Sequence, residues 1–356
     1  MYQYSLCSPK ANDDIGKIRK EQTGKKEDVS PRDWSEFERF ALSVMHGETF
    51  NDLATSLSQC DIVLINGEGC IYDRTRQSRM IFFIAYLAKR FFDKPTAMVN
   101  HSIVMNDPVL EEIAWHVYPL LDDIVFREGD SARACPAGRG RVAADAAYLY
   151  APQPQGQWCR SASPVEDSAE VYWHVGAFDP QAPYACIGGG SVYFRGLRPG
   201  FDAIPGFLRL CRALQASVGQ VMLTASSAKD MRILEPVAER LGLPLAGANL
   251  PVQTAVNLMG NARVYIGARW HPSIFAHRGG TPVIALSRHT PKMDAFLQQA
   301  EMPPSALDPF ALEDQLDAIM AAVRAHLYEG EELRDRLHNG AARLASLARE
   351  NVRLLT

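Results

Sequence analysis

Arg269, His271 and Ser273 are the residues of this chain best placed to act on an anion. They follow the short apolar segment 264–266, which predicts a buried strand. Pro272 is expected at the first position of the next helix, where proline loses no hydrogen bond. Free N–H groups at a helix amino end favour anions, an arginine can clamp a carboxylate or phosphate, and a histidine can deliver a proton. We therefore expect Arg269 and Ser273 to bind an anionic donor and His271 to be catalytic.

Glu68 is the carboxylate best suited to proton transfer. It lies between Gly67 and Gly69, in the segment 66–69 that ends the predicted buried strand 61–65. These glycines permit positive φ and a close approach of a ligand to the backbone. A carboxylate there could take a proton from a ligand hydroxyl or deliver one. The structural alternative is a glutamate that caps the next helix or pairs with a nearby arginine.

Other polar residues follow predicted strands and extend the candidate site. Asp145 could be a second catalytic carboxylate, even a nucleophile, or simply a turn-forming aspartate. A glycine-rich turn could hold phosphate through its N–H groups, and serines at a helix start could add contacts. The expected donor-binding residues, besides Arg269 and Ser273, are Gly188, Gly189, Gly190, Ser191, Ser226, Ser227 and Lys292. The expected acceptor-binding residues are Asn66, Asn100 and His101.

Strands and helices alternate along the chain, which predicts an α/β fold with parallel sheets. The segment 151–169 is rich in Pro, Gln and Ser and lacks apolar periodicity, so it predicts a linker. We therefore expect domains at 1–155 and 156–330. Two long helices are expected at 308–328 and 331–355, and the segment 331–356 is expected to pack back on the first domain by analogy with two-domain folds.

The composition narrows the class of protein. The 356 residues allow two sizeable cores, and a net charge of -4 gives no broad attraction to nucleic acid. The seven cysteines are scattered without any CxxC pair, which favours reduced thiols over disulfides or zinc. No signal peptide or membrane span is apparent, and no metal or cofactor is required. We expect a cytoplasmic protein, compatible with peripheral association at the inner face of the cytoplasmic membrane.

Six motifs, taken in order, resemble the polysaccharide pyruvyl transferase family over roughly residues 60–300. That resemblance implies two Rossmann-like domains facing a cleft, the glycosyltransferase-B arrangement. It also implies transfer of a pyruvyl group from phosphoenolpyruvate to a sugar diol in polysaccharide biosynthesis. The motifs are Asn66-Gly-Glu-Gly-Cys-Ile-Tyr-Asp73, Asn100-His-Ser-Ile103, Arg127-Glu-Gly-Asp130, Asp145-Ala-Ala147, Arg269-Trp-His271 and Gly280-Thr-Pro-Val-Ile-Ala-Leu-Ser-Arg-His-Thr-Pro-Lys292.

The chain departs from the family at three places. It has Glu68 where the family usually has glycine, and it lacks an early Gly-Asp loop. His271-Pro272 looks like the His-Pro motif of bacterial sialyltransferases and Kdo transferases, which holds the CMP part of a donor. Two alternatives therefore stay open: glycosyl transfer from a CMP-activated sugar acid, and a non-catalytic carbohydrate-binding protein. The acceptor under either transferase hypothesis is a glycan or lipid-linked glycan.

Overall fold

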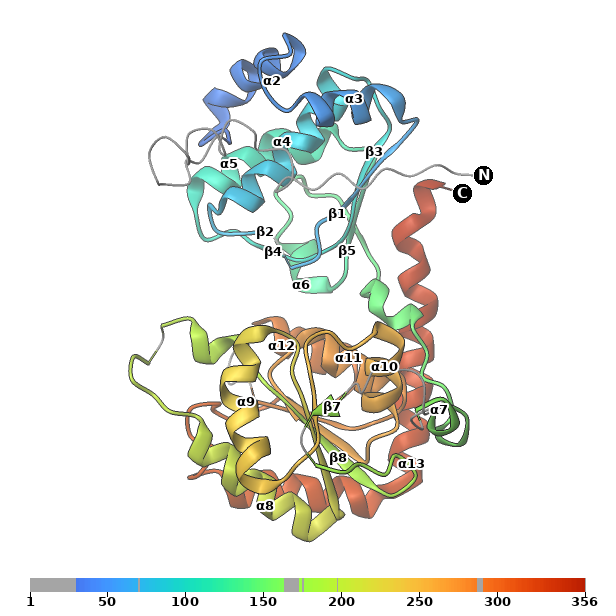
Figure 1. Cartoon of the computed structure of the whole chain (residues 1–356). Coiled ribbons are helices and arrows are strands. Elements are labelled where there is room, and N and C mark those ends of the chain that lie inside the picture. Colours follow the sequence, from blue (N-terminus) through green and yellow to red (C-terminus); the bar gives the residue numbers. More distant parts are fainter. Residues whose placement is uncertain are drawn as a thin grey trace. The chain divides into compact units, whose positions relative to one another are not determined.

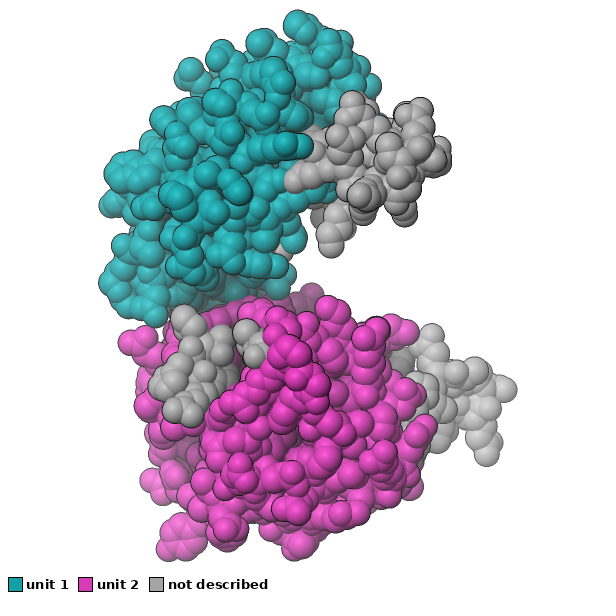
Figure 2. All heavy atoms as spheres, turned by 90° about the vertical axis from the view of Figure 1, so that its left-hand side faces the viewer, with its two compact units in different colours: residues 1–146, 347–356 teal, residues 147–346 magenta. Residues whose placement is uncertain are grey.

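The computed structural model describes residues 30–69, 71–162, 173–174, 176–196, 198–286 and 291–355. The chain divides into two compact units, drawn in teal and magenta in Figure 2. Unit 1 comprises residues 1–146 and 347–356, and unit 2 comprises residues 147–346. The chain thus passes between units at 146/147, whereas the sequence placed the boundary at 155/156. Gln153 already belongs to unit 2, because its backbone N–H donates to the side chain of Asn257 at 2.8 Å.

Unit 1 contains a parallel sheet with the strand order β1-β3-β5-β6. Helices pack on one face through a large apolar core, and the other face packs against Leu354. This contact explains why the last residues of the chain belong to unit 1. The main elements are α2 Phe37–Met45, α3 Asn51–Gln59, β1 Val63–Asn66, α4 Arg76–Arg90, β3 Thr96–His101, α5 Pro108–Val117, β5 Asp123–Phe126, α6 Gly129–Arg133, β6 Arg141–Val142 and the terminal 3-10 helix η5 Arg349–Leu355. A separate two-stranded sheet pairs β2 Ile71–Tyr72 with β4 Ile103–Val104.

Local sequence signals set the ends of several helices. Helix α5 starts at a strong signal: the Asp107 carboxylate accepts from the N–H groups of Val109 and Leu110, and Pro108 is the first helical residue. In α4 the Thr75 hydroxyl accepts from the backbone N–H of Ser78. These caps satisfy amide groups that have no partner inside the helix.

Unit 2 contains a six-stranded sheet with the order β12-β11-β8-β9-β10-β7. All pairs are parallel except β10 with β7. Helices α8 and α9 lie on one face and α10 and α11 on the other (Figure 1). The elements are β7 Trp173–His174, β8 Tyr184–Gly188, α8 Ile204–Val218, β9 Gln220–Thr224, α9 Ala228–Leu241, β10 Leu245–Ala246, α10 Val252–Gly260, β11 Val264–Gly267, α11 Trp270–Arg278, β12 Val283–Ala285 and α12 Pro291–Gln299.

Two expectations about the connecting segments need correction. The predicted linker contains helix α7, Gln155–Ala162, which buries Trp158 to 2% exposure; residues 163–172 lie outside the described part. The predicted helix start at Asp308 is also wrong, because Asp308 and Gln315 bond to each other in an irregular segment before α13, Leu316–Ala348. The predicted break near residue 330 is confirmed by non-helical Gly330, at φ 58° and ψ -128°.

Among the described residues, no helix is long and apolar enough to cross a membrane.

Candidate functional site

The strand order of unit 2 reverses between β8 and β11. From β8 the chain builds β9 and β10 on one side, and then it crosses to build β11 and β12 on the other. At this reversal the Ala268 N–H donates to the Gly189 carbonyl across 3.3 Å. Open α/β sheets bind ligands outside the carboxyl ends of their strands at such a reversal. The residues after β8, β9 and β11 therefore form the candidate donor site.

Arg269 extends from the end of β11 to the start of α9. Its Nη2 donates to the Asp230 carboxylate at 2.7 Å and to the Ser227 hydroxyl at 3.0 Å. Asp230 is fully buried, and it also accepts from the backbone N–H of Ser226 at 3.0 Å. The structure thus brings three predicted donor-site residues together, around an aspartate that the sequence reading missed. The signal for Asp230 was present, since Ser227 and Asp230 have the spacing of a helix capping box.

The glycines at the end of β8 are explained by close packing. A Cβ atom at Gly188 would lie 2.1 Å from the Tyr265 hydroxyl, at Gly189 2.6 Å from the Asp230 carboxylate, and at Gly190 2.8 Å from Ala268. All three glycines are buried, and Ser191 begins the 3-10 helix η4, Ser191–Phe194. Their predicted role in holding phosphate stays a hypothesis.

Two buried polar atoms at this reversal lack hydrogen-bond partners among the described residues. They are the Tyr265 hydroxyl and Nε of Arg269. Burial, reinforced by the charge of Asp230, raises the pKa of Tyr265 far above its usual value, so the phenol stays protonated. Leaving a buried donor unpaired costs about 1–3 kcal/mol, which a bound ligand or water would recover. Tyr265 is a second residue that the sequence reading missed.

Helix α11 begins two residues earlier than predicted. Trp270 is its first residue and Pro272 its third, and the N-cap residue Arg269 contributes no side-chain cap. His271 is half-buried and stacks on Phe275 with ring centroids 6.5 Å apart. Ser273 is buried, and its hydroxyl donates to the Arg269 carbonyl at 2.7 Å. The structure therefore gives Ser273 a helix-start role in place of the expected donor contact.

Lys292 lies beside the start of α11. Its ammonium is 5.5 Å from the ring centroid of Trp270, a cation–π distance, and its side chain is exposed. Trp270 is itself buried against Phe296. A cation held on a buried ring next to Arg269 and His271 adds positive charge to this part of unit 2.

The carboxyl edge of the unit 1 sheet carries two residues with strained backbone. Glu68 has φ 34° and Asn100 has φ 55°, so the strain falls on these residues rather than on the flanking glycines. Glu68 is half-buried and Asn66 is exposed. The Asn100 amide donates to Asn66 at 3.2 Å and accepts from the Ala146 N–H at 2.9 Å. Strained residues of this kind concentrate at functional sites, which keeps Glu68 a candidate.

Two other predicted site residues, His101 and Asp145, are buried in unit 1. His101 is fully buried, donates from Nδ1 to the Val125 carbonyl, and accepts at Nε2 from the Tyr118 hydroxyl, both at 3.0 Å. Burial lowers the pKa of His101 to about 3. Asp145 is 1% exposed and pairs with fully buried Arg127 at 2.8 Å. These placements give His101 and Asp145 structural roles instead of the acceptor-binding and catalytic roles expected from sequence.

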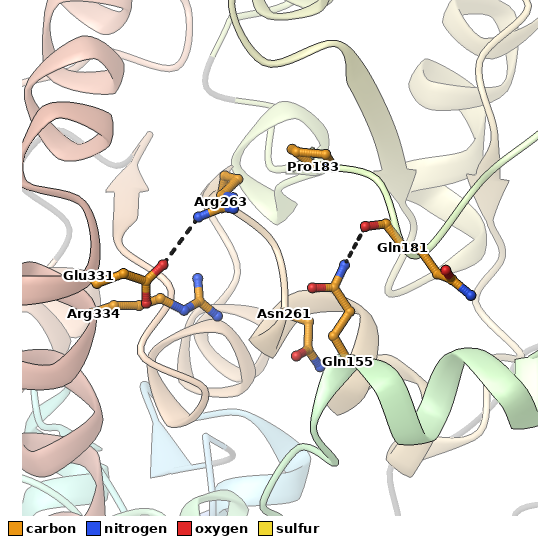
Figure 3. Close-up of a pocket in the computed structure, with 7 residues that line it drawn as sticks. All are labelled: Gln155, Gln181, Pro183, Asn261, Arg263, Glu331 and Arg334. Carbon is orange, nitrogen blue, oxygen red and sulfur yellow. Dashed lines mark hydrogen bonds and ion pairs between the residues drawn. The ribbon is translucent and has the colours of Figure 1, made fainter.

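A polar pocket of about 210 Å³ lies at the opposite, amino edge of the unit 2 sheet (Figure 3). Pro183 and Arg263 on its wall directly precede β8 and β11. Arg263 pairs with Glu331 at 3.3 Å, and the Arg334 guanidinium donates to the carbonyls that end α10 and α11. Its cations are thus already engaged, and it lies away from the edge where such sheets bind ligands.

Among the described residues, no group of three or more His, Cys, Asp or Glu side chains could hold a metal ion.

Comparison with solved structures supports the expected fold class. UDP-N-acetylglucosamine 2-epimerase from Neisseria meningitidis, solved with UDP-GlcNAc, is 11% identical with a TM-score of 0.52, over 90% of this chain and 79% of that one. A Listeria monocytogenes protein assigned as the same kind of epimerase is 14% identical with a TM-score of 0.50, over 86% and 77%. At such identities the similarity shows the fold alone, a glycosyltransferase-B-like pair of α/β domains.

Comparison with curated proteins gave no match. The model of the polysaccharide pyruvyl transferase family, in contrast, matches residues 4–290. This match spans most of the chain and includes every site residue predicted from the sequence except Lys292. It covers the segment from residue 60 to residue 290, which holds nearly all of the motifs found in the sequence. The chain therefore belongs to the polysaccharide pyruvyl transferase family and is a transferase.

Proposed function

We propose that this protein transfers a pyruvyl group from phosphoenolpyruvate to two hydroxyl groups of a sugar, forming a ketal and releasing phosphate. Family membership supports the reaction class. The observation that carries the donor site is the cluster of Arg269, Ser227 and Asp230 beside His271, at the strand reversal of unit 2. Phosphoenolpyruvate bears a carboxylate and a phosphate on one carbon, so it needs the cations and helix amino end that this region offers.

The reaction balances with three proton transfers, one to the donor and two from the sugar hydroxyls. A proton adds to the methylene carbon of phosphoenolpyruvate, and the neighbouring carbon becomes electron-poor. The first sugar hydroxyl adds to that carbon and loses its proton. The carbon–oxygen bond to phosphate then breaks, phosphate leaves, and the second hydroxyl adds and loses its proton. One of the two protons lost replaces the proton added to the methylene, and the other leaves with phosphate.

The chain supplies a candidate for each task. His271 delivers the proton to the methylene, and Arg269 holds the carboxylate. Lys292 adds positive charge for the phosphate. Glu68 in unit 1 takes the proton from the acceptor hydroxyl, with Asn66 as an acceptor contact. The acceptor is a glycan, free or linked to a lipid at the cytoplasmic face of the membrane.

The alternative donor, a CMP-activated sugar acid, has weaker support. It requires the turn 271–273 to hold the cytidylate phosphate, yet the Ser273 hydroxyl is buried and bonded to the Arg269 carbonyl.

Ligand-induced thermal shift separates the two donors, because a ligand that binds the native state raises the melting temperature. We expect phosphoenolpyruvate to raise the melting temperature and CMP to leave it unchanged. A shift with CMP and none with phosphoenolpyruvate would overturn the proposal. Phosphate release from phosphoenolpyruvate on addition of a glycan acceptor then tests turnover. Activity lost in Glu68→Gln with donor binding retained would exclude a purely carbohydrate-binding role.

A further inference from the structure

Asp230 has more contacts than a helix cap requires. Its carboxylate accepts from the Ser226 N–H at 3.0 Å, the Ser227 hydroxyl at 3.2 Å and Arg269 Nη2 at 2.7 Å. The side chain is fully buried, whereas that of its partner Arg269 is 22% exposed. The aspartate is therefore fixed inside the unit, and the arginine reaches from it to the surface.

The end of β8 is a third element that packs against the Asp230 side chain. A Cβ atom at Gly189, just after β8, would lie 2.6 Å from Asp230 Oδ1. Glycine at 189 is thus required where Asp230 meets the end of β8, although its φ is ordinary. The ends of β8 and β11 and the start of α9 all converge on one carboxylate.

This arrangement leaves part of the Arg269 guanidinium for a ligand. Asp230 and Ser227 occupy Nη2, while the buried Nε has no partner in the part of the chain that the structure describes. A free arginine side chain loses up to about 2 kcal/mol of rotamer entropy when a ligand immobilises it. An arginine already held by Asp230 has lost that freedom before the ligand arrives, so less binding energy is spent on ordering it.

We propose that Asp230 is a positioning residue that holds the Arg269 guanidinium in place for the carboxylate of the donor. This inference rests on the proposed function, because it assigns Arg269 to the phosphoenolpyruvate carboxylate. Asp230 itself touches no substrate. Its loss leaves the proton-transfer groups in place and misplaces the cation that binds donor.

Two variants disturb the aspartate by different routes. Asp230→Asn removes its charge with little change of shape. Gly189→Ala keeps the charge but pushes a methyl group against the carboxylate. We expect both to lower kcat/KM for phosphoenolpyruvate by about 10- to 100-fold, mainly through a higher KM, since misplacing a binding group by about 1 Å has effects of that size.

Glu313→Gln is the matched control. Glu313 pairs with Arg209 at 2.8 Å in the same unit, and both side chains are exposed. Its loss is expected to leave KM and kcat unchanged. A purely structural role for Asp230 would lower the melting temperature and the active fraction without raising KM.

The measurements are steady-state kinetics, calorimetric titration with phosphoenolpyruvate, and crystal structures of both variants. If the wild-type protein binds phosphoenolpyruvate and the variants have an unchanged KM, the inference is wrong and the proposed function stands. Wild-type protein that fails to bind phosphoenolpyruvate would overturn the function. The variant structures then decide the positioning role: Arg269 moved away from Ser227 supports it, and Arg269 unmoved refutes it. If neither variant folds, Asp230 belongs to the fold alone and the inference fails.

Discussion

Each unit has an arginine–aspartate pair beyond the carboxyl ends of its strands, and the two pairs differ in exposure. In Arg127–Asp145 the side chains are 0% and 1% exposed, so a dissolved ligand reaches neither. In the Arg269–Asp230 pair only the aspartate side chain is fully buried, whereas the arginine side chain is 22% exposed. Removing one partner of a sealed pair typically costs 3–5 kcal/mol, because a buried charge is left uncompensated. The first pair therefore serves the fold of unit 1, and the second can serve the fold and a ligand together.

His271 gives the sharpest prediction for single-residue chemistry. If it delivers the proton to the donor, His271→Ala should lower kcat by about 10²- to 10⁴-fold. His271→Gln retains an N–H donor but cannot deliver a proton, so its kcat should stay low even if its KM recovers. Phosphate release assays measure both constants. His338→Ala, an exposed histidine of the same unit, is the control. Recovery of kcat in the glutamine variant would make His271 a ligand-binding residue only.

The buried histidines predict how stability depends on pH. Burial lowers the pKa of His101 and of His277 to about 3. Each is neutral in the folded protein, while in the unfolded chain it takes up a proton below about pH 6.5. The unfolded state then binds more protons, so the stabilising contribution is complete above pH 6.5 and falls as pH drops. The expected loss approaches about 1.4 kcal/mol per pH unit for each histidine.

Urea unfolding between pH 7 and pH 5 tests this sign, because few carboxyl groups titrate in that interval. His101→Asn removes one titrating group and keeps an N–H donor for the Val125 carbonyl. Its unfolding free energy should vary less steeply with pH than that of the wild type, whatever its absolute stability. Equal slopes in the two proteins would show that His101 takes up its proton over the same pH range in the folded and unfolded states.

Sequence patterns located these side chains along the chain but could not tell which way they point. His101 and Asn100 both end β3, yet one is sealed in the core and the other links three chain segments. Asp145 was equally ambiguous, because its partner Arg127 comes from a different strand end. Asp230 was detectable through its spacing from Ser227, which is local. Contacts between distant segments leave no comparable trace in one sequence.

At the scale of elements, strong local signals were reliable. Helix α9 runs from Ala228 to Leu241, since Ser227 caps its start and Gly242 ends it in a left-handed conformation. Helix α7 was missed because its sequence is polar and it depends on burying Trp158.

The kink in α13 predicts that substitution by alanine lowers stability at one glycine of this helix and raises it at another. Gly330 has φ 58° and ψ -128°, a conformation that disfavours a side chain, although a Cβ there would meet nothing within 4 Å. Gly330→Ala should therefore destabilise by about 1–3 kcal/mol through backbone strain alone. Gly340 is helical with only ordinary contacts, so Gly340→Ala should stabilise by up to about 1 kcal/mol.

Chemical unfolding of the two variants measures both values. Gly340→Ala is the matched control, since it adds the same methyl group to the same helix. A neutral Gly330→Ala would mean that α13 can straighten at this point, and that the break is not imposed by the rest of unit 2.

At the scale of the whole molecule, the strand order of unit 2 alone identifies an edge for ligand binding. The described strands of unit 1 run in chain order from β1 to β6 without a reversal, whereas those of unit 2 reverse between β8 and β11. Unit 2 also has polar residues at both sheet edges, with the pocket of Figure 3 at the amino edge. We assign the donor to the carboxyl edge because the strand order reverses there, although the pocket lies at the other edge.

Hydrogen exchange with and without phosphoenolpyruvate tests this assignment across the molecule. At a donor concentration of about 100 times Kd, amides that open only when the donor leaves should exchange about 100-fold more slowly. We expect this protection in the segments 188–191, 226–230 and 268–273, which follow β8, β9 and β11. The segments 181–183, 261–263 and 331–334 line the pocket at the other edge and act as internal controls that should not change. Protection of the control segments alone would move the donor site to the amino edge, and protection confined to residues 30–146 would move it to unit 1.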